Sequence, residues 1–188
     1  VYYFYSYFKL NKETVSFSVP TGNFGDVFAG YISKKMGLPI DKLIVATNEN
    51  DILHRAISKG DYVSKEVRET ISPSMDIQLA SNFERLIYYV NSSDSEKTAE
   101  IMKKVKQNSY QIEKNNLEII QKDFLSESCN EQETLDIIKK NYEENNIILD
   151  PHTAVGVGAA KKLSFNDCVV LSTAHPCKFP DATNNAIN

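Results

Sequence analysis

The sequence from 16 to 26 reads Ser16-Phe17-Ser18-Val19-Pro20-Thr21-Gly22-Asn23-Phe24-Gly25-Asp26, an alternating apolar run followed by a turn with two glycines. Alternation of Val15, Phe17 and Val19 predicts a strand, which Pro20 ends because proline donates no ladder hydrogen bond. A helix is predicted next, ending near Gly37, because apolar residues recur at helical spacing. These residues are Phe24, Val27, Phe28, Tyr31, Ile32 and Met36.

The turn between this strand and this helix has the composition of an anion-binding loop. Gly22 and Gly25 have no Cβ, so we expect the backbone to adopt positive φ there and to approach a ligand closely. The first N–H groups of the helix have no partner within it and converge on the same place. Such a loop suits a phosphate group, although glycine at this position is as often only a tight turn.

Two more strands and another helix extend the pattern. Apolar runs predict buried strands at Leu43–Thr47 and Val169–Thr173, and a helix over Ile52–Lys59 that ends at Gly60. Strands that alternate with helices predict an α/β fold with a mainly parallel sheet and helices on both faces. We expect residues 1–188 to form a single α/β domain.

Three other segments are predicted to be helical. Six aromatic residues among Val1–Phe8 suggest the interior of a buried helix that has no N-cap before it. An apolar stripe predicts one continuous helix over Met75–Val90. The segment Asn91–Asn146 is polar and contains no Gly or Pro, so we interpret it as a helical insertion packed over the sheet.

A last helix is predicted to begin at Asp150 and Pro151, with the aspartate as its N-cap. Gly156 and Gly158 would let this helix lie close to the sheet. His152 stands beside the helix start, where a structural histidine with satisfied hydrogen bonds is favoured over a catalytic one.

Polar side chains follow the second predicted strand. Asn48, Asn50 and Asp51 come at its carboxyl end, where ligands of open α/β sheets bind. Capping of the next helix by Asn50 or Asp51 explains the same residues equally well. The sequence leaves both interpretations open.

Composition narrows the function classes. The chain has 188 residues, is 41% hydrophobic and carries a net charge of −4, which is typical of a globular domain and gives no basic footprint for nucleic acid. No apolar run has membrane-spanning length and the first residues do not resemble a signal peptide, so we expect a cytoplasmic protein. Three dispersed cysteines indicate neither a disulfide framework nor a metal site.

Five ordered blocks of this sequence resemble threonine synthase, a pyridoxal-phosphate enzyme of fold type II. The first two are S-V-P-T-G-N-F-G-D-V-F-A-G-Y from Ser18 and K-K-M-G-L-P-I-D-K-L-I-V-A-T-N-E-N-D-I-L from Lys34. The others are S-P-S-M-D-I-Q with S-N-F-E-R between Ser72 and Arg85, D-P-H-T-A-V-G-V from Asp150, and T-A-H-P-C-K-F-P from Thr173. Only the segment 91–146 matches poorly.

The resemblance implies a set of site residues. The phosphate of pyridoxal 5'-phosphate would be held by Gly22, Asn23, Phe24 and Gly25. Thr173 would face the ring nitrogen of the cofactor. Contacts to the substrate O-phosphohomoserine are expected from Ser72, Ser74, Asn82 and Arg85.

The resemblance also implies what this chain lacks. No lysine here matches the family's Schiff-base lysine, so we expect no catalytic residue in this chain and no activity without an N-terminal region of the same enzyme. The complete enzyme would convert O-phosphohomoserine and water to threonine and phosphate. Two alternatives stay open: another fold type II enzyme, such as a serine or threonine deaminase or a cysteine synthase, and a phosphate-binding module without activity.

Overall fold

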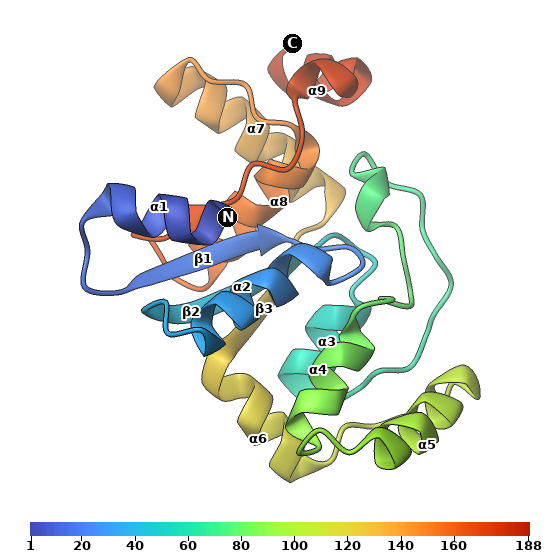
Figure 1. The fold of residues 1–188 in the computed structure, drawn as a ribbon. Helices are drawn as coiled ribbons and strands as arrows, with labels where there is room; N and C mark the ends of the chain where they lie inside the picture. Colours follow the sequence, from blue (N-terminus) through green and yellow to red (C-terminus); the bar gives the residue numbers. More distant parts are fainter.

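The computed structural model describes residues 1–188 as a parallel sheet surrounded by helices (Figure 1). The strands are β1 (Val15–Pro20), β2 (Ile40–Thr47), β3 (Phe124–Ser128) and β4 (Val169–Val170). The α-helices are α1 (Tyr2–Leu10), α2 (Gly25–Lys35), α3 (Ile52–Lys59), α4 (Phe83–Val90), α5 (Ser95–Lys106), α6 (Lys114–Asp123), α7 (Glu131–Asn145), α8 (Pro151–Lys162) and α9 (Pro180–Ile187). Two 3₁₀ turns are η1 (Pro73–Met75) and η2 (Pro176–Lys178).

The four strands form one sheet in the order β3-β2-β1-β4, and every neighbouring pair is parallel. The predicted α/β class is therefore confirmed. The expected strand over 169–173 is shorter than predicted, since only Val169 and Val170 pair with β1 and the N–H of Leu171 adds one further bond to Ser18. Residues 172 and 173 lie beyond the sheet, at its carboxyl edge.

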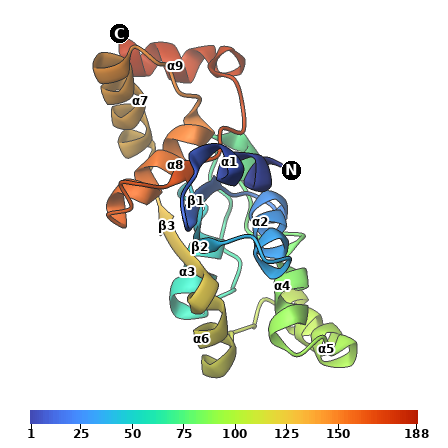
Figure 2. The ribbon, with the colours of Figure 1, turned by 60° about the vertical axis from the view of Figure 1, so that its left-hand side comes forward.

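Helices cover both faces of this sheet, as predicted (Figure 2): β1 is buried along its whole length, and β2 is apolar on both sides from Leu43 to Ala46. On one face α8 packs Val155 and Ala159 against Ile44 and Ala46 of β2. The larger part of the core lies on the other face. There Phe17, Val19, Leu43 and Val45 pack with residues of α2, α3 and α4.

Gly156 of α8 allows the close contact with the sheet that the sequence predicts, whereas Gly158 faces Cys129 and Ile137 of α7. A Cβ on Gly156 would lie 2.9 Å from Val170 Cγ1 and 3.1 Å from Pro20 Cγ. The Ser18 hydroxyl donates a 2.6 Å hydrogen bond to the Gly156 carbonyl. Asp150 caps α8 through its side chain and Pro151 occupies the first turn, which confirms the predicted helix start.

Helix α2 keeps most of its predicted apolar stripe inside. Val27, Phe28 and Tyr31 are buried, and the helix ends before Gly37, whose φ is 99°. Met36 was expected on the same stripe but is 72% exposed, because the helix has already ended when the chain reaches it.

The aromatic first helix is not the buried interior that the sequence suggests. Only Tyr3 of α1 is buried, and its ring packs edge to face on Phe17 at 4.8 Å. Tyr2, Tyr5 and Phe8 are between 63% and 74% exposed. The prediction is wrong because α1 lies on the surface of the domain and presents one residue, rather than a whole face, to the core.

The predicted helix from Met75 to Val90 is also wrong in its first half. Residues 73–75 form only the turn η1, and α4 begins at Phe83. Backbone groups between them bond outside any helix: the Gln78 carbonyl accepts from the Ser64 hydroxyl, and the Ala80 N–H donates to Tyr62. These tertiary bonds outweigh the helical spacing of the apolar residues.

The polar segment 91–146 contains α5, α6 and α7, but it also contains the edge strand β3, which the sequence analysis missed. Phe124 pairs beside Leu43 and Ser128 beside Thr47. No glycine or proline marks the passage from α6 into β3, so the sequence carries no signal of a break. The segment therefore contributes one strand to the sheet in addition to its helices, and its interpretation as a purely helical insertion is wrong.

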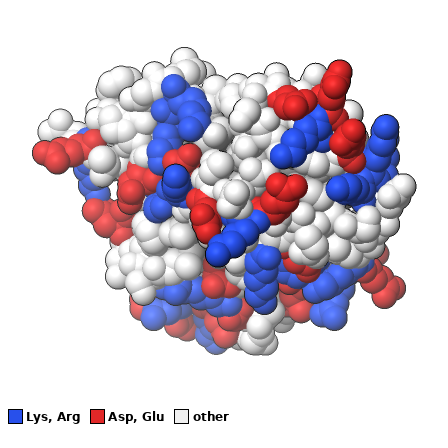
Figure 3. Space-filling model, turned by 90° about the horizontal axis from the view of Figure 1, so that it is seen from below, with Lys and Arg blue, Asp and Glu red and all other residues white.

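One face of the surface is mixed in charge, with Lys and Arg beside Asp and Glu (Figure 3). Oppositely charged side chains also pair within the chain, for example Lys34 with Asp123 at 2.7 Å. No helix in the chain combines the length and the apolar character needed to cross a membrane.

Candidate functional site

The loop between β1 and α2 leaves a continuous row of backbone donors without a protein acceptor. Thr21 donates its N–H to Ala46 at 2.8 Å, and Phe28 donates to Phe24 at 3.1 Å. Between them, the six N–H groups from Gly22 to Val27 make no hydrogen bond within the protein. Three of these donors precede the helix, so the row is longer than a helix start alone provides.

The glycines of this loop serve a different purpose from the one expected. Neither Gly22 nor Gly25 has a positive φ; Phe24 adopts the left-handed conformation, with φ of 66°. A Cβ on Gly22 would lie 2.5 Å from the Ser74 carbonyl oxygen, and one on Gly25 would lie 3.3 Å from Asn82 Nδ2. Gly22 is thus required by the close approach of the Ser74 backbone, and Gly25 relieves a tight contact with the Asn82 side chain; neither is required by backbone conformation.

Two segments far apart in sequence therefore hold the loop. Both the N–H and the Nδ2 of Asn82 donate to the Asn23 carbonyl, at 3.1 and 3.0 Å. Phe24 anchors the loop to the core, since its ring is buried against Phe83 and Phe124, with 5.0 and 5.7 Å between ring centroids. A loop fixed in this way presents its donors without reorganisation when a ligand arrives.

A cavity of about 470 Å³ opens beside the loop at the carboxyl edge of β1 and β4. Its walls are the first turn of α2, one side of α1 and the chain that leaves β4. They comprise Tyr2, Ser6, Asp26, Val169, Val170, Leu171, Ser172 and Thr173. The structure thus brings Thr173 to the same cavity as the residue that follows Gly25.

Asp26 and Tyr3 are residues of this region that the sequence analysis missed. The Tyr3 hydroxyl lies 2.9 Å from the Asp26 carbonyl and 3.2 Å from Asp26 Oδ1. Burial raises the pKa of Tyr3 above its ordinary value, and the nearby Asp26 carboxylate adds to the rise. Tyr3 also packs over Gly30, where a Cβ would meet its ring at 2.6 Å. A glycine inside this helix is the sequence signal that could have indicated such a close contact.

The carboxyl end of β2 differs from this loop, because its polar side chains are hydrogen-bonded within the protein. Asn48 Nδ2 donates to Thr70 Oγ1 at 2.8 Å and to Asp76 Oδ1 at 2.7 Å. Asn50 Nδ2 donates to the Arg68 carbonyl at 2.9 Å, and the Arg68 N–H returns a bond of the same length. These asparagines hold the loop over residues 68–76.

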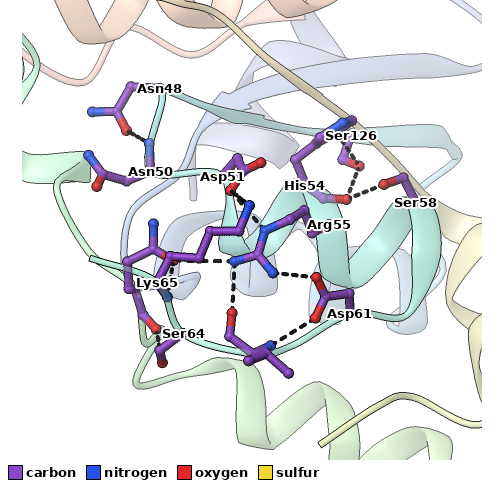
Figure 4. Close-up of polar contacts among 12 residues, drawn as sticks. Asn48, Asn50, Asp51, His54, Arg55, Ser58, Asp61, Ser64, Lys65 and Ser126 are labelled. Atoms are coloured by element: carbon purple, nitrogen blue, oxygen red, sulfur yellow. Dashed lines mark hydrogen bonds and ion pairs between the residues drawn. The ribbon is translucent and has the colours of Figure 1, made fainter. Parts of the chain in front are cut away.

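Capping of α3 does not describe Asn50 and Asp51. Asp51 stands at the N-cap position of α3 but makes no capping bond; its carboxylate accepts from Arg55 Nε at 2.8 Å (Figure 4). The buried Arg55 guanidinium also bonds Asp61 at 2.5 Å and the Val63 carbonyl at 2.8 Å. The capping interpretation of Asn50 and Asp51 is wrong, since Asn50 bonds the backbone of Arg68 and Asp51 pairs with Arg55 of α3.

The four residues expected to contact substrate lie in different surroundings. Ser72 is buried and its hydroxyl accepts from Asn48 Nδ2 at 3.0 Å, so the β2 network uses it. Ser74 is exposed and lies against Gly22, and Asn82 holds Asn23. The structure therefore brings Ser74 and Asn82 to the loop. Their contact with substrate stays a prediction.

Arg85 is separated from Thr173. It lies on α4 and lines a second cavity of about 590 Å³ between α4, α5 and Phe28, whose lining shares no residue with the cavity at Thr173. Its guanidinium makes no ion pair or hydrogen bond within the protein. Contact of Arg85 with substrate stays a prediction.

No group of three His, Cys, Asp or Glu side chains is arranged to hold a metal ion. The three cysteines are free thiols, and burial raises the pKa of Cys129 to about 11. His152 is buried, with a ring nitrogen 3.2 Å from Asp150 Oδ1 and the other 3.2 Å from the Ser74 N–H. The predicted satisfied, structural histidine is confirmed.

Known proteins resemble this chain in sequence and in overall structure. Residues 153–188 match the family model described as "Threonine synthase, C-terminal". The threonine synthase of Saccharomyces cerevisiae is 47% identical over 212 residues, covering 100% of this chain and 41% of the relative. The crystal structure of the threonine synthase from Brucella melitensis with bound pyridoxal phosphate superposes with a TM-score of 0.96 at 44% identity, over 99% of this chain and 41% of that one.

More distant structures share the fold alone. Threonine deaminase isoform 2 from Solanum lycopersicum superposes with a TM-score of 0.54 at 13% identity, over 94% of this chain and 43% of that one. The fold is fold type II of the pyridoxal-phosphate enzymes, which defines the class of the chain. Within that class the chain belongs to the threonine synthase family, and it spans about 41% of the length of the family members described above.

Proposed function

We propose that this chain is part of a threonine synthase that converts O-phosphohomoserine and water to threonine and phosphate with pyridoxal 5'-phosphate as cofactor. The observation that carries the proposal is the row of six free N–H groups from Gly22 to Val27, in a chain 47% identical to a threonine synthase over its full length. The deaminase alternative is weaker, because identity to that class falls to 13%.

The residues present fit the cofactor's chemistry. A phosphate ester dianion needs several convergent donors, and the loop offers N–H groups from the αL residue Phe24 and its neighbours. Pyridoxal phosphate, when bound, supplies an electron sink that stabilises negative charge on carbons of the substrate.

The chain's own contribution is binding and orientation. Gly22, Asn23, Phe24 and Gly25 would bind the phosphate through their N–H groups, and Asn82 would keep this loop in place through Asn23. Thr173 would offer its hydroxyl to the ring nitrogen from the end of β4. A neutral hydroxyl at that atom does not require a protonated nitrogen, in contrast to a carboxylate.

The amine that links the cofactor would come from outside these residues. The cavity lined by Thr173 contains no lysine among its walls. Catalysis also needs a proton carrier placed at the reacting carbons, and the Thr173 cavity offers no such base other than Asp26. We therefore propose that the complete enzyme adds the lysine and the rest of the substrate site, in a cytoplasmic protein.

The test compares this chain alone with the same chain joined to the remainder of a threonine synthase. Each sample is incubated with pyridoxal phosphate and reduced with borohydride, labelled lysines are mapped by mass spectrometry, and phosphate release from O-phosphohomoserine is assayed. We expect labelling at one lysine and turnover only in the joined protein. One stoichiometrically labelled lysine with turnover in this chain alone would contradict the proposal.

A further inference from the structure

His152 occupies a position that links α8 to the β1–α2 loop. It lies in the first turn of α8 and its side chain is 4% exposed. Nδ1 is 3.2 Å from Asp150 Oδ1, and Nε2 is 3.2 Å from the backbone nitrogen of Ser74. The ring also packs on Phe179, with 4.8 Å between centroids.

These neighbours determine which nitrogen carries the proton. The Asp150 carboxylate can only accept, so Nδ1 must donate to it. The Ser74 N–H can only donate, so Nε2 must present a lone pair. The pKa of Asp150 lies below its ordinary value, since hydrogen bonds from His152 and Thr153 outweigh the effect of burial, which raises it. The two hydrogen bonds together therefore place the proton of the imidazole on Nδ1.

The backbone of Ser74 connects this histidine to the loop. Its N–H is bonded to His152, and its carbonyl oxygen is the atom that a Cβ on Gly22 would approach to 2.5 Å. Gly22 provides the first of the six free N–H groups. The hydrogen bond at Nε2 thus holds the Pro73–Ser74 peptide, and through the Ser74 Cα it restrains the next peptide, whose carbonyl packs directly on the loop.

We propose that His152 is a positioning residue for the phosphate loop: held by Asp150, it restrains the backbone of Ser74, whose carbonyl in turn positions Gly22 and its neighbouring N–H groups. His152 touches neither cofactor nor substrate in this role. The inference rests on the proposed function of the loop as a phosphate site. It adds a residue that neither the sequence nor the family resemblance assigned to that site.

Two substitutions separate positioning from simple filling of space. The amide of His152→Gln reaches about as far as Nε2 and can still accept from Ser74, whereas that of His152→Asn reaches only as far as Nδ1 and can still bond Asp150. Inorganic phosphate and pyridoxal 5'-phosphate serve as probes in equilibrium dialysis. We expect the affinity for both probes to fall about tenfold in His152→Asn, the equivalent of one lost hydrogen bond, and to stay within about threefold in His152→Gln.

Two NMR measurements on the ligand-free chain complete the test. Long-range ¹H–¹⁵N spectra should show a protonated Nδ1 and an unprotonated Nε2. Amide signals of Gly22 and Asn23 should move in His152→Asn and stay near wild type in His152→Gln. Equal affinities and equal spectra in the two variants, or a proton on Nε2, would overturn the inference. Failure of the wild-type chain to bind either probe would instead count against the proposed function, while the spectra still decide the role of His152.

Discussion

Two neighbouring strands of this sheet end in loops of similar appearance and opposite behaviour. The β1–α2 loop directs six backbone N–H groups to no acceptor in the protein. At the end of β2, the buried side chains of Asn48 and Asn50 bond the loop of residues 68–76. Both places lie at the carboxyl edge of a parallel sheet, where ligands bind in this class of fold.

The difference shows that location at a strand end does not define a binding site. Polar side chains at β2 look more like ligand contacts in sequence, but their hydrogen-bonding capacity is used to stabilise the protein. The loop after β1 has little side-chain chemistry, and its backbone donors have no acceptor within the protein, as the proposed phosphate site requires. Substitutions in the two loops should therefore change different quantities, affinity in the first and stability in the second.

The largest effect is expected from Gly22→Ala. Its Cβ would lie 2.5 Å from the Ser74 carbonyl oxygen, and because that atom is backbone, the loop itself must move. We expect the affinity for pyridoxal phosphate to fall about 100-fold or more, near 3 kcal/mol. Gly25→Ala is the graded comparison: its Cβ would lie 3.3 Å from Asn82 Nδ2, which needs a shift of only a few tenths of an ångström, so we expect a smaller loss, below about tenfold. Equal losses in the two variants, measured by dialysis, would contradict this account of the loop.

Asn50→Ala tests the other loop. It removes two hydrogen bonds to Arg68 and leaves those backbone groups without their partner. We expect the free energy of unfolding to fall by about 2 to 3 kcal/mol, with phosphate affinity within about twofold of wild type. Urea denaturation and dialysis measure the two quantities. A variant with unchanged stability and reduced affinity would place Asn50 in the binding site.

Arg55→Leu should cost about 2 kcal/mol at neutral pH, since it breaks charge-assisted bonds of a buried guanidinium to partly exposed carboxylates. The pKa of Asp61 lies below its ordinary 3.8, because bonds from Arg55 outweigh the opposing effect of burial. A lowered folded pKa means that this stabilisation is present above pH 3.8 and is lost as the pH falls through the folded value. Denaturation curves at several pH values should therefore show the variant and wild type converging in acid. Arg68→Leu, at an exposed ion pair with Glu49, should change stability by less than about 0.5 kcal/mol.

The smallest effect is expected from Thr173→Val, which keeps the shape of the side chain and removes its hydroxyl. If that hydroxyl faces the ring nitrogen, affinity for pyridoxal phosphate should fall about fivefold, near 1 kcal/mol, and affinity for inorganic phosphate should not change. Ser172→Ala, in the same cavity wall, should leave both affinities near wild type. Unchanged pyridoxal phosphate affinity in Thr173→Val would remove Thr173 from the proposed site.

The sequence predicts the β1–α2–β2 unit well, because its signals are local. Alternation defines β1, helical spacing defines α2, and Pro20 and Gly37 mark their ends. Asp150 and Pro151 likewise specify the start of α8 within three residues. The resemblance to threonine synthase added the class of the fold, which the comparisons support.

The remainder depends on contacts that no local pattern contains. β3 forms because Phe124 pairs with Leu43 on the adjacent strand β2, far away in the sequence. The bond of the Ala80 N–H to Tyr62 helps keep residues 76–82 out of a helix. The role of the loop glycines could not be predicted either, since Ser74 approaches Gly22 from more than fifty positions away. Asp26 and Tyr3 become part of the site region only because α1 folds over α2.

The most direct test of the β1–α2 loop is a titration of the ¹⁵N-labelled chain with pyridoxal 5'-phosphate and, separately, with pyridoxal, which lacks the phosphate. If the free N–H groups bind phosphate, pyridoxal phosphate should bind at least about tenfold more tightly than pyridoxal. The amide signals of residues 22–27 should move most, and those of Asn48 and Asn50 should move little. Equal affinity for the two compounds, with no selective change at residues 22–27, would contradict the central claim.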